Sequence, residues 1–213
     1  MMAKPAARGA GTGMPGVARA VLADANIFFG GLRDIFLWLR CRDIIHLHWT
    51  REIEDEWVRN LARKRGIDPG RLMDGVAALM RTAVPDWEVP GYEKLIGRFD
   101  GVHEGDQHVA AAALTLAQDD YPGERVALVT RNIRDFKQSA FAGTSVARYE
   151  PDDYLTRLMS ESPVEVAAAC DQARALRTAP PWSRAEFLVN LRNAQNCGKF
   201  ATQLAAQWRR EGK

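Results

Sequence analysis

The chain has 213 residues, of which 46% are hydrophobic and 26% charged, and its formal net charge is +2. This length allows one well-cored α/β domain with a small appendage, and the composition is that of a soluble globular protein. No window approaches 18 continuous apolar residues, and the three cysteines lack the spacing of a disulfide framework or a zinc site. We therefore expect a cytoplasmic protein that does not enter a membrane.

The charge is unevenly distributed along the chain. Residues 1–19, rich in Gly, Ala and Pro, carry +3 and read as a disordered leader, whereas residues 20–158 hold 18 basic and 22 acidic side chains. Residues 159–213 return to +3. An acidic domain attracts phosphates poorly, so a cation would have to bridge it to a nucleic acid.

The first half of the chain alternates short apolar runs with amphipathic segments. Residues 20–23 and 44–48 have the pattern of buried strands. Residues 31–41 favour a helix, and Thr50 offers an N-cap for a second helix that runs to about residue 65. A further helix is expected over about 69–82.

The second half continues this alternation and then changes character. Residues 85–103, rich in Pro and Gly, stay unassigned, and residues 106–118 form an Ala-rich helical segment. Residues 126–129 are the clearest buried strand, and a last strand is expected at 145–149. The alternation predicts a three-layer α/β/α fold with a mostly parallel central sheet.

Beyond about residue 160 the pattern indicates helices only. Ser162-Pro163 and the capping box Ser183-x-x-Glu186 are helix starts, and Gly198 separates the later helices. We therefore expect a leader, an α/β core and a small C-terminal helical appendage, with bounds 1–19, 20–158 and 159–213.

Four carboxylates are expected at one edge of this sheet. Asp24 follows the first strand directly, and Asp135 follows the strand at 126–129. Asp106 opens the Ala-rich helix, and Glu56 lies in the second turn of the Thr50 helix. Residues past the carboxyl ends of parallel strands line the functional crevice of such folds.

Converging carboxylates cannot all ionise without a counter-charge. Mg²⁺ or Mn²⁺ with oxygen ligands would resolve that conflict. Such ions activate water and neutralise a phosphodiester under attack, so the acids point to metal-assisted phosphoryl chemistry.

Four motifs occur in order with α/β spacing: LADANIFF (22–29), WTREIEDEWVRNL (49–61), GDQHVAAAAL (105–114) and LVTRNIRDF (128–136). Over about residues 20–155 the chain resembles a PIN domain, in the subgroup similar to VapC toxins of bacterial toxin–antitoxin pairs. The resemblance implies a metal-dependent endoribonuclease that hydrolyses RNA with metal-activated water. It also implies a cognate antitoxin as partner, and it leaves a homodimer open.

The resemblance assigns roles residue by residue. Asp24, Glu56, Asp106 and Asp135 match the catalytic, metal-binding acids of the family. Asn26 and Asn132 match positions where a polar side chain often accompanies the acids.

Several assignments have alternatives. Glu52, Glu54 and Asp55 share a helix with Glu56, and Asp135 is also read as a loop acid paired with a neighbouring arginine. His108 either approaches the site or is partly buried structure. A basic set that includes Arg59, Arg63, Arg131 and Arg134 is either a solvated face or a groove for the RNA backbone.

Two other functions compete with the ribonuclease. A PIN-like module that binds RNA or a protein without cutting is the main alternative. An aspartyl phosphohydrolase needs a second aspartate two residues after the first, and Asn26 stands there instead.

Overall fold

A computed structural model describes residues 16–177 and 180–212. Residues 1–15, most of the predicted disordered leader, lie outside the described residues. Val17 and Ala18, which follow them, are buried. The Val17 amide donates to a Glu161 carboxylate oxygen (2.6 Å), and the Ala18 carbonyl accepts from the Tyr154 hydroxyl (2.9 Å). The chain thus joins the folded body before the first strand begins.

The described residues form four strands in one parallel sheet. Their bounds are Ala20–Ala23 (β1), His46–His48 (β2), Val126–Val129 (β3) and Val146–Tyr149 (β4). The order across the sheet is β2-β1-β3-β4, so β1 and β3 are central. Every residue of these two strands is buried, which explains their uninterrupted apolar sequences.

The second strand is shorter than predicted because the chain is still turning out of the preceding helix at residue 44. That helix, α1, spans Gly31–Cys41. Asp43 then adopts a left-handed conformation with a φ of 54°, and the Ile44 amide donates back to the Leu39 carbonyl (2.9 Å). This closure satisfies the helix end, and pairing with β1 begins only at His46.

The helix that the Thr50 signal predicts is α2, Arg51–Arg65. The Thr50 hydroxyl accepts from the Ile53 amide (3.1 Å), as an N-cap does. Gly66 ends the helix in a left-handed conformation with a φ of 64°. Its buried face carries Ile53, Trp57 and Leu61, which follow one another at intervals of four residues.

Two further predicted helices are interrupted by wider, π-type turns. The helix over 69–82 consists of α3 (Pro69–Leu72), a π turn (Met73–Ala77) and α4 (Ala78–Ala83). The Ala-rich helix consists of a 3-10 turn (Glu104–Asp106), α5 (Gln107–Thr115) and a π turn (Leu116–Asp120). Further 3-10 turns are Ala25–Phe28, Tyr92–Leu95, Ile133–Asp135 and Gln138–Phe141.

The C-terminal helices begin earlier than the sequence pattern suggests, at residue 151 instead of about 160. Their bounds are Pro151–Glu161 (α6), Pro163–Ala175 (α7), Arg184–Asn193 (α8) and Gly198–Arg210 (α9). Pro151 occupies the first turn of α6, where a proline costs no hydrogen bond. Tyr154 in the same helix is fully buried and stacks on Phe36 of α1, with ring centroids 6.0 Å apart. The predicted capping box of Ser183 and Glu186 is present at the start of α8.

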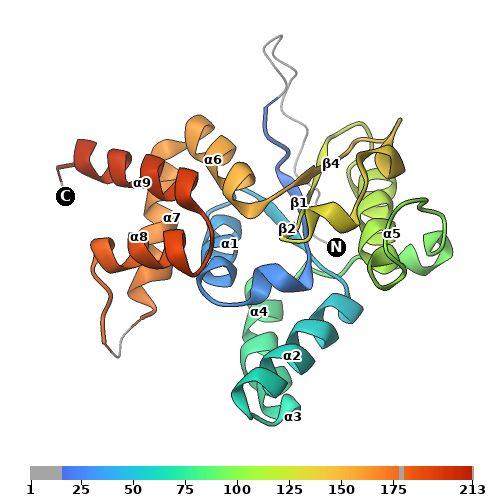
Figure 1. The fold of residues 1–213 in the computed structure, drawn as a ribbon, viewed down its shortest axis with the longest axis horizontal. Helices are drawn as coiled ribbons and strands as arrows, with labels where there is room; N and C mark the ends of the chain where they lie inside the picture. Colours follow the sequence, from blue (N-terminus) through green and yellow to red (C-terminus); the bar gives the residue numbers. More distant parts are fainter. Residues whose placement is uncertain (1–15, 178–179, 213) are drawn as a thin grey trace.

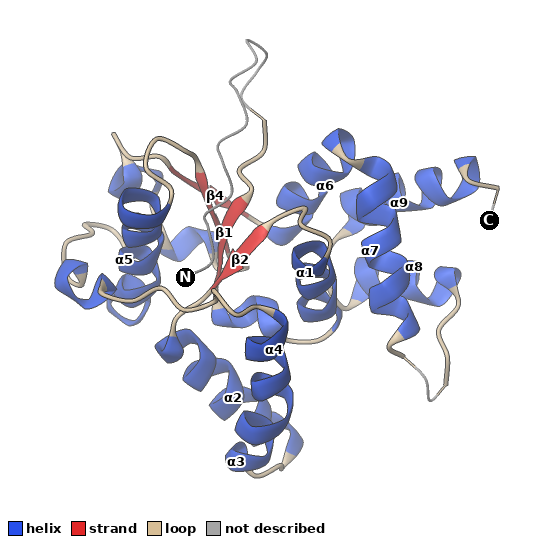
Figure 2. Cartoon of the chain, turned by 180° about the vertical axis from the view of Figure 1, so that it is seen from behind, coloured by secondary structure: helices blue, strands red, loops and turns tan. Residues whose placement is uncertain are grey.

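The predicted three-layer α/β/α architecture is confirmed. Figures 1 and 2 show the sheet between α5 on one side and α1 on the other, with α6–α9 packed beyond α1. α2–α4 project from one end of the sheet. None of the helices built by the described residues combines the length and the apolar character that crossing a membrane requires.

The edge strand β2 carries a buried neutral histidine. His48 is 5% exposed; its Nδ1 donates to the Asp86 carbonyl (2.8 Å), and its Nε2 accepts from the Tyr121 hydroxyl (3.0 Å). Burial lowers the pKa of His48 from 6.5 to about 4, against the smaller raising effect of Asp86.

Because His48 is buried in its neutral form, we expect the folded protein to lose stability in acid. The pKa of His48 is lower in the folded state, so the unfolded chain takes up a proton first as the pH falls. The stability that neutral His48 contributes is therefore fully present above pH 6.5 and is lost as the pH falls toward 4. Between pH 7 and pH 5 the free energy of unfolding should drop by about 2 kcal/mol through this group. His48→Asn keeps a donor for Asp86 and does not titrate, so urea unfolding should show a smaller drop in this variant. Equal drops in both proteins would contradict the prediction.

Candidate functional site

The carboxyl ends of the two central strands bring Asp24 and Thr130 together. Ala23 pairs with Val129 in the sheet, so the next residue of each strand lies at the same edge. The Thr130 hydroxyl donates to Asp24 Oδ2 (2.6 Å), and the Asp24 amide donates to the Val129 carbonyl (3.1 Å). Asp24 is only 4% exposed, and residues of both strands hold its carboxylate at the carboxyl-terminal edge of the sheet.

Asn26 joins this arrangement from the 3-10 turn after β1. Its Nδ2 donates to Asp24 Oδ2 (2.5 Å) and to the Thr130 hydroxyl (3.1 Å). Its Oδ1 accepts from the Arg131 amide (2.9 Å), so one side chain ties the loop after β1 to the loop after β3. Asn26 thus fixes the orientation of the Asp24 carboxylate.

The other predicted acids act on Asp24 through their charge. Burial raises the pKa of Asp24 from 3.8 to about 6, against the lowering effect of the Thr130 hydrogen bond. The negative charges of Glu56 and Asp106 raise it further. Asp24, Glu56 and Asp106 therefore lie near enough to interact electrostatically across the strand ends.

Asp135 is linked to the same group through Asp106. Burial raises the pKa of Asp106, and the charge of Asp135 raises it further. The backbone places the two together, because the His103 amide donates to the Asp135 carbonyl (3.2 Å). Asp106 is half-buried, whereas Asp135 is exposed. The four acids thus form an electrostatic series, Glu56–Asp24–Asp106–Asp135, which we call the acidic site.

The acids of α2 have different surroundings. Glu54 is fully buried, where Oε1 accepts from Arg81 Nη1 (2.5 Å) and Oε2 accepts from the Trp49 indole (3.2 Å). Glu52 is exposed and accepts from the Tyr92 hydroxyl (3.3 Å). Glu56 is half-buried, and it is the α2 acid whose charge acts on Asp24. These surroundings favour Glu56 over its neighbours as the site acid of this helix.

His108, which was expected either to approach the site or to be partly buried structure, is buried in the first turn of α5. Its Nδ1 lies 4.0 Å from a Glu52 carboxylate oxygen, and its Nε2 has no hydrogen-bond partner among the described residues. Its positive form would lower the pKa of Asp106. The histidine therefore borders the acidic site from the α5 side.

The predicted RNA-binding arginines differ in exposure. Arg59, Arg63 and Arg134 are exposed, and Arg63 Nη2 donates to the Asn60 side chain (3.2 Å). Arg131 is instead half-buried, because its guanidinium is bound by Gln195 of the turn between α8 and α9. Asn132, the second predicted supporting residue, is exposed, and its amide donates to the Thr130 hydroxyl (3.0 Å).

The acidic site offers the type of ligand atom that a hard divalent cation prefers. Its ligands are carboxylate oxygens, which Mg²⁺ and Mn²⁺ prefer, and their like charges leave a deficit of positive charge. Over residues 16–177 and 180–212, no three His, Cys, Asp or Glu side chains converge closely enough to form a ready-made metal cage. These residues therefore fit such a cation by the chemistry of their oxygens and not as a preformed cage.

Two residues at this edge are absent from the sequence-based predictions. Thr130 bonds Asp24 directly, and Gln195 binds Arg131 from the C-terminal helices. Thr130 stands within the motif LVTRNIRDF, so its place at the end of a buried strand was a usable signal. Gln195 lies 64 residues beyond Arg131, and no local pattern marks it.

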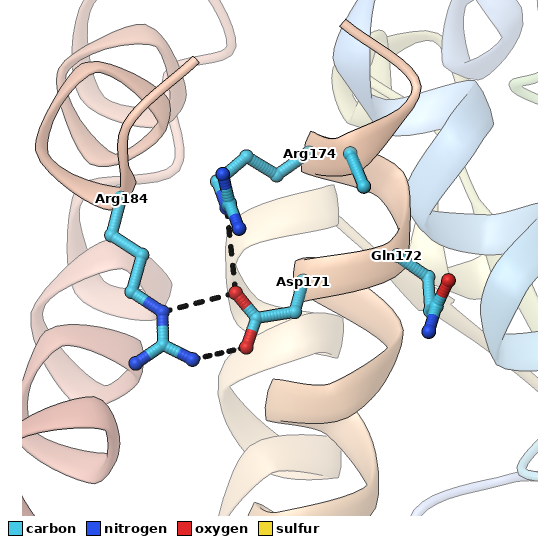
Figure 3. A pocket seen from close by; sticks show the side chains of 5 residues that line it. Asp171, Gln172, Arg174 and Arg184 are labelled. Atoms are coloured by element: carbon cyan, nitrogen blue, oxygen red, sulfur yellow. Dashed lines mark hydrogen bonds and ion pairs between the residues drawn. The ribbon is translucent and has the colours of Figure 1, made fainter. Parts of the chain in front are cut away.

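A surface hollow of about 580 Å³ lies between α7 and α8 and is lined by none of the predicted site residues. Figure 3 shows its wall, where Arg184 and Arg174 converge on Asp171. Arg184 also lies over the Trp208 ring, 4.5 Å from its centroid. These contacts tie α7, α8 and α9 together, which gives the cluster a structural role.

Residues 151–206 match the family model described as the VapC50 C-terminal domain. This segment covers α6 to α8 and most of α9, almost entirely outside the residues that carry the predicted resemblance. The match confirms, from a separate part of the chain, the resemblance to VapC-type toxins of the PIN-domain family. Comparison with curated proteins and with solved structures yields no match.

Proposed function

We propose that this chain, VapC-like by the match of its C-terminal helices, is a metal-dependent endoribonuclease and the toxin of a toxin–antitoxin pair. One observation carries the proposal: the charges of Glu56 and Asp106 act on the buried carboxylate of Asp24, and that of Asp135 acts on Asp106. A buried acid under like charges is costly in a purely structural role. Such groups mark functional sites, where a ligand offsets the cost.

In this proposal the four acids hold Mg²⁺ or Mn²⁺ at the edge of the sheet. When bound, the cation supplies Lewis-acid chemistry and offsets negative charge on the RNA phosphodiester. The hydroxyl of Thr130 and the amide of Asn26 both donate to one oxygen of Asp24, Oδ2. That arrangement fixes the carboxylate of Asp24, which would be one of the ligands of the cation.

The exposed arginines of α2 complement the acids. Arg59 and Arg63 lie three and seven residues after Glu56, so they share its side of the helix. Arg134 stands next to Asp135 in the loop after β3. We infer that these arginines hold the RNA backbone beside the acidic site without reading its sequence.

A cleavage assay tests the proposed function. The purified protein should cut total RNA in Mg²⁺ or Mn²⁺, lose this activity in excess chelator and regain it when the metal is restored. Calorimetry should show Mn²⁺ binding under the same conditions. A protein that neither cuts RNA nor binds Mn²⁺ would instead be the non-cleaving binding module.

VapC toxins pair with antitoxins, and we infer a small cognate antitoxin for this chain. The acidic site favours a basic segment of that partner, since complementary charge promotes association. Such an antitoxin should suppress RNA cleavage in the same assay.

A further inference from the structure

The turn between α8 and α9 reaches the loops that carry the acidic site. Gln195 in this turn is 7% exposed, and it accepts hydrogen bonds from the guanidinium group of Arg131. Arg131 Nη1 donates to the Gln195 carbonyl (3.1 Å), and Nη2 donates to Gln195 Oε1 (2.7 Å). Hydrogen bonds from a charged donor are among the stronger ones, so they restrain the arginine.

Arg131 in turn is bonded to the residues that orient Asp24. Its amide donates to Asn26 Oδ1 (2.9 Å), and Asn26 Nδ2 donates to Asp24 Oδ2 (2.5 Å). Thr130, directly before Arg131, donates to the same carboxylate oxygen (2.6 Å). A continuous path of hydrogen bonds and one peptide link therefore joins Gln195 to Asp24.

Gln195 also contacts the loop after β1. Gly30 has a φ of +72°, and a Cβ placed there would lie 2.9 Å from Gln195 Nε2. At Gly31 a Cβ would approach Asn190 Oδ1 of α8 to 3.4 Å. The glycines thus allow the C-terminal helices to lie directly against the loop that carries Asn26.

The turn that presents Gln195 is itself well fixed. The Cys197 amide donates to the Leu191 carbonyl (2.8 Å), and Asn196 adopts a left-handed φ of 53°. At the start of α9, the amides of Lys199 and Phe200 donate to the Asp152 carboxylate (3.1 and 2.8 Å). Gln195 is therefore held by the helical segment and is not a mobile surface side chain.

We propose that Gln195 is a positioning residue of the acidic site, through which the C-terminal helices hold Arg131, Asn26 and Asp24 in place. Arg131, which the sequence predicts to bind RNA, then has a structural role, because both of its terminal nitrogens donate to Gln195. The inference rests on the proposed function for its effect on cleavage, but its structural part is independent of it.

Gln195→Ala, Gln195→Glu and Asn193→Ala in the full chain test this inference. Asn193 is exposed at the end of α8, and the hydrogen bonds of Arg131 go to Asn26 and Gln195 instead. Hydrogen exchange of the Arg131 amide, which does not require metal or RNA, is the primary measurement. In Gln195→Ala it should quicken about tenfold, the scale of a lost charged hydrogen bond, while buried α2 amides stay unchanged. Gln195→Glu keeps an acceptor oxygen and should restore slow exchange, and Asn193→Ala should match the wild type.

The outcomes separate this inference from the proposed function. If the wild type cleaves RNA, Gln195→Ala should lower kcat about tenfold with little change in KM, and Gln195→Glu should recover it. Unchanged exchange at Arg131, or equal acceleration throughout the chain, would overturn the positioning role. Selective acceleration in a protein that cuts no RNA would support the positioning role and refute the ribonuclease.

Discussion

Asp24→Asn is expected to abolish RNA cleavage and at the same time to stabilise the metal-free protein. Cleavage should fall by about 10³-fold, because a catalytic cation contributes several kcal/mol and loses a central ligand in this variant. Asparagine presents its Oδ1 to Thr130 and Asn26, so the hydrogen bonds of Asp24 Oδ2 have a substitute. The variant should therefore fold normally while failing to catalyse.

The gain in stability follows from the raised pKa of Asp24. This pKa is about 6 in the folded state, against 3.8 for an unperturbed aspartate, so ionisation above pH 6 costs the folded protein free energy. The cost at pH 7 is about 3 kcal/mol and fades as the pH falls from 6 toward 3.8. Removal of this charge should raise the melting temperature by about 6–12 °C at pH 7.5 in chelator.

Differential scanning calorimetry at pH 7.5 and at pH 5 checks this effect, and the advantage of the variant should shrink at the lower pH. Mn²⁺ should raise the melting temperature of the wild type more than that of Asp24→Asn. Asp55→Asn on α2 is the matched control and should behave as the wild type in both assays. Equal RNA cleavage by Asp24→Asn and the wild type would remove Asp24 from the site.

Arg81→Ala should be the most destabilising single change among those considered. It leaves the fully buried Glu54 carboxylate without its guanidinium partner (2.5 Å), so that among the described side chains the Trp49 indole is its remaining donor. Loss of one partner of a buried ion pair costs about 3–5 kcal/mol. The melting temperature should accordingly fall by about 10 °C.

Urea unfolding measures this loss of stability, and a double variant tests whether the unpaired charge causes it. Glu54→Met combined with Arg81→Met removes both charges and should recover much of the stability, as apolar replacements of buried ion pairs often do. The double variant should also retain RNA cleavage, since Glu54 belongs to the packing of α2 on α4. A loss of cleavage in a stable double variant would instead place Glu54 in the acidic site.

Local patterns predicted most of the fold. The apolar runs at 20–23 and 126–129 are buried central strands, and Thr50 and Ser183 are N-caps. These features depend on interactions within a few residues, which sequence displays directly. The boundary errors at residues 44 and 151 arose where a closing turn or a tertiary contact decided the geometry.

The sequence by itself determined the architecture and, by its motifs, the VapC resemblance and the position of Asp24 at a strand end. Only the tertiary structure separates the acids of α2, because Glu54 is buried in an ion pair with Arg81, whereas the charge of Glu56 raises the pKa of Asp24. It likewise decided that Arg131 is bound by Gln195. Such contacts join residues far apart in the chain, and their energies depend on burial and on charges that no local pattern contains.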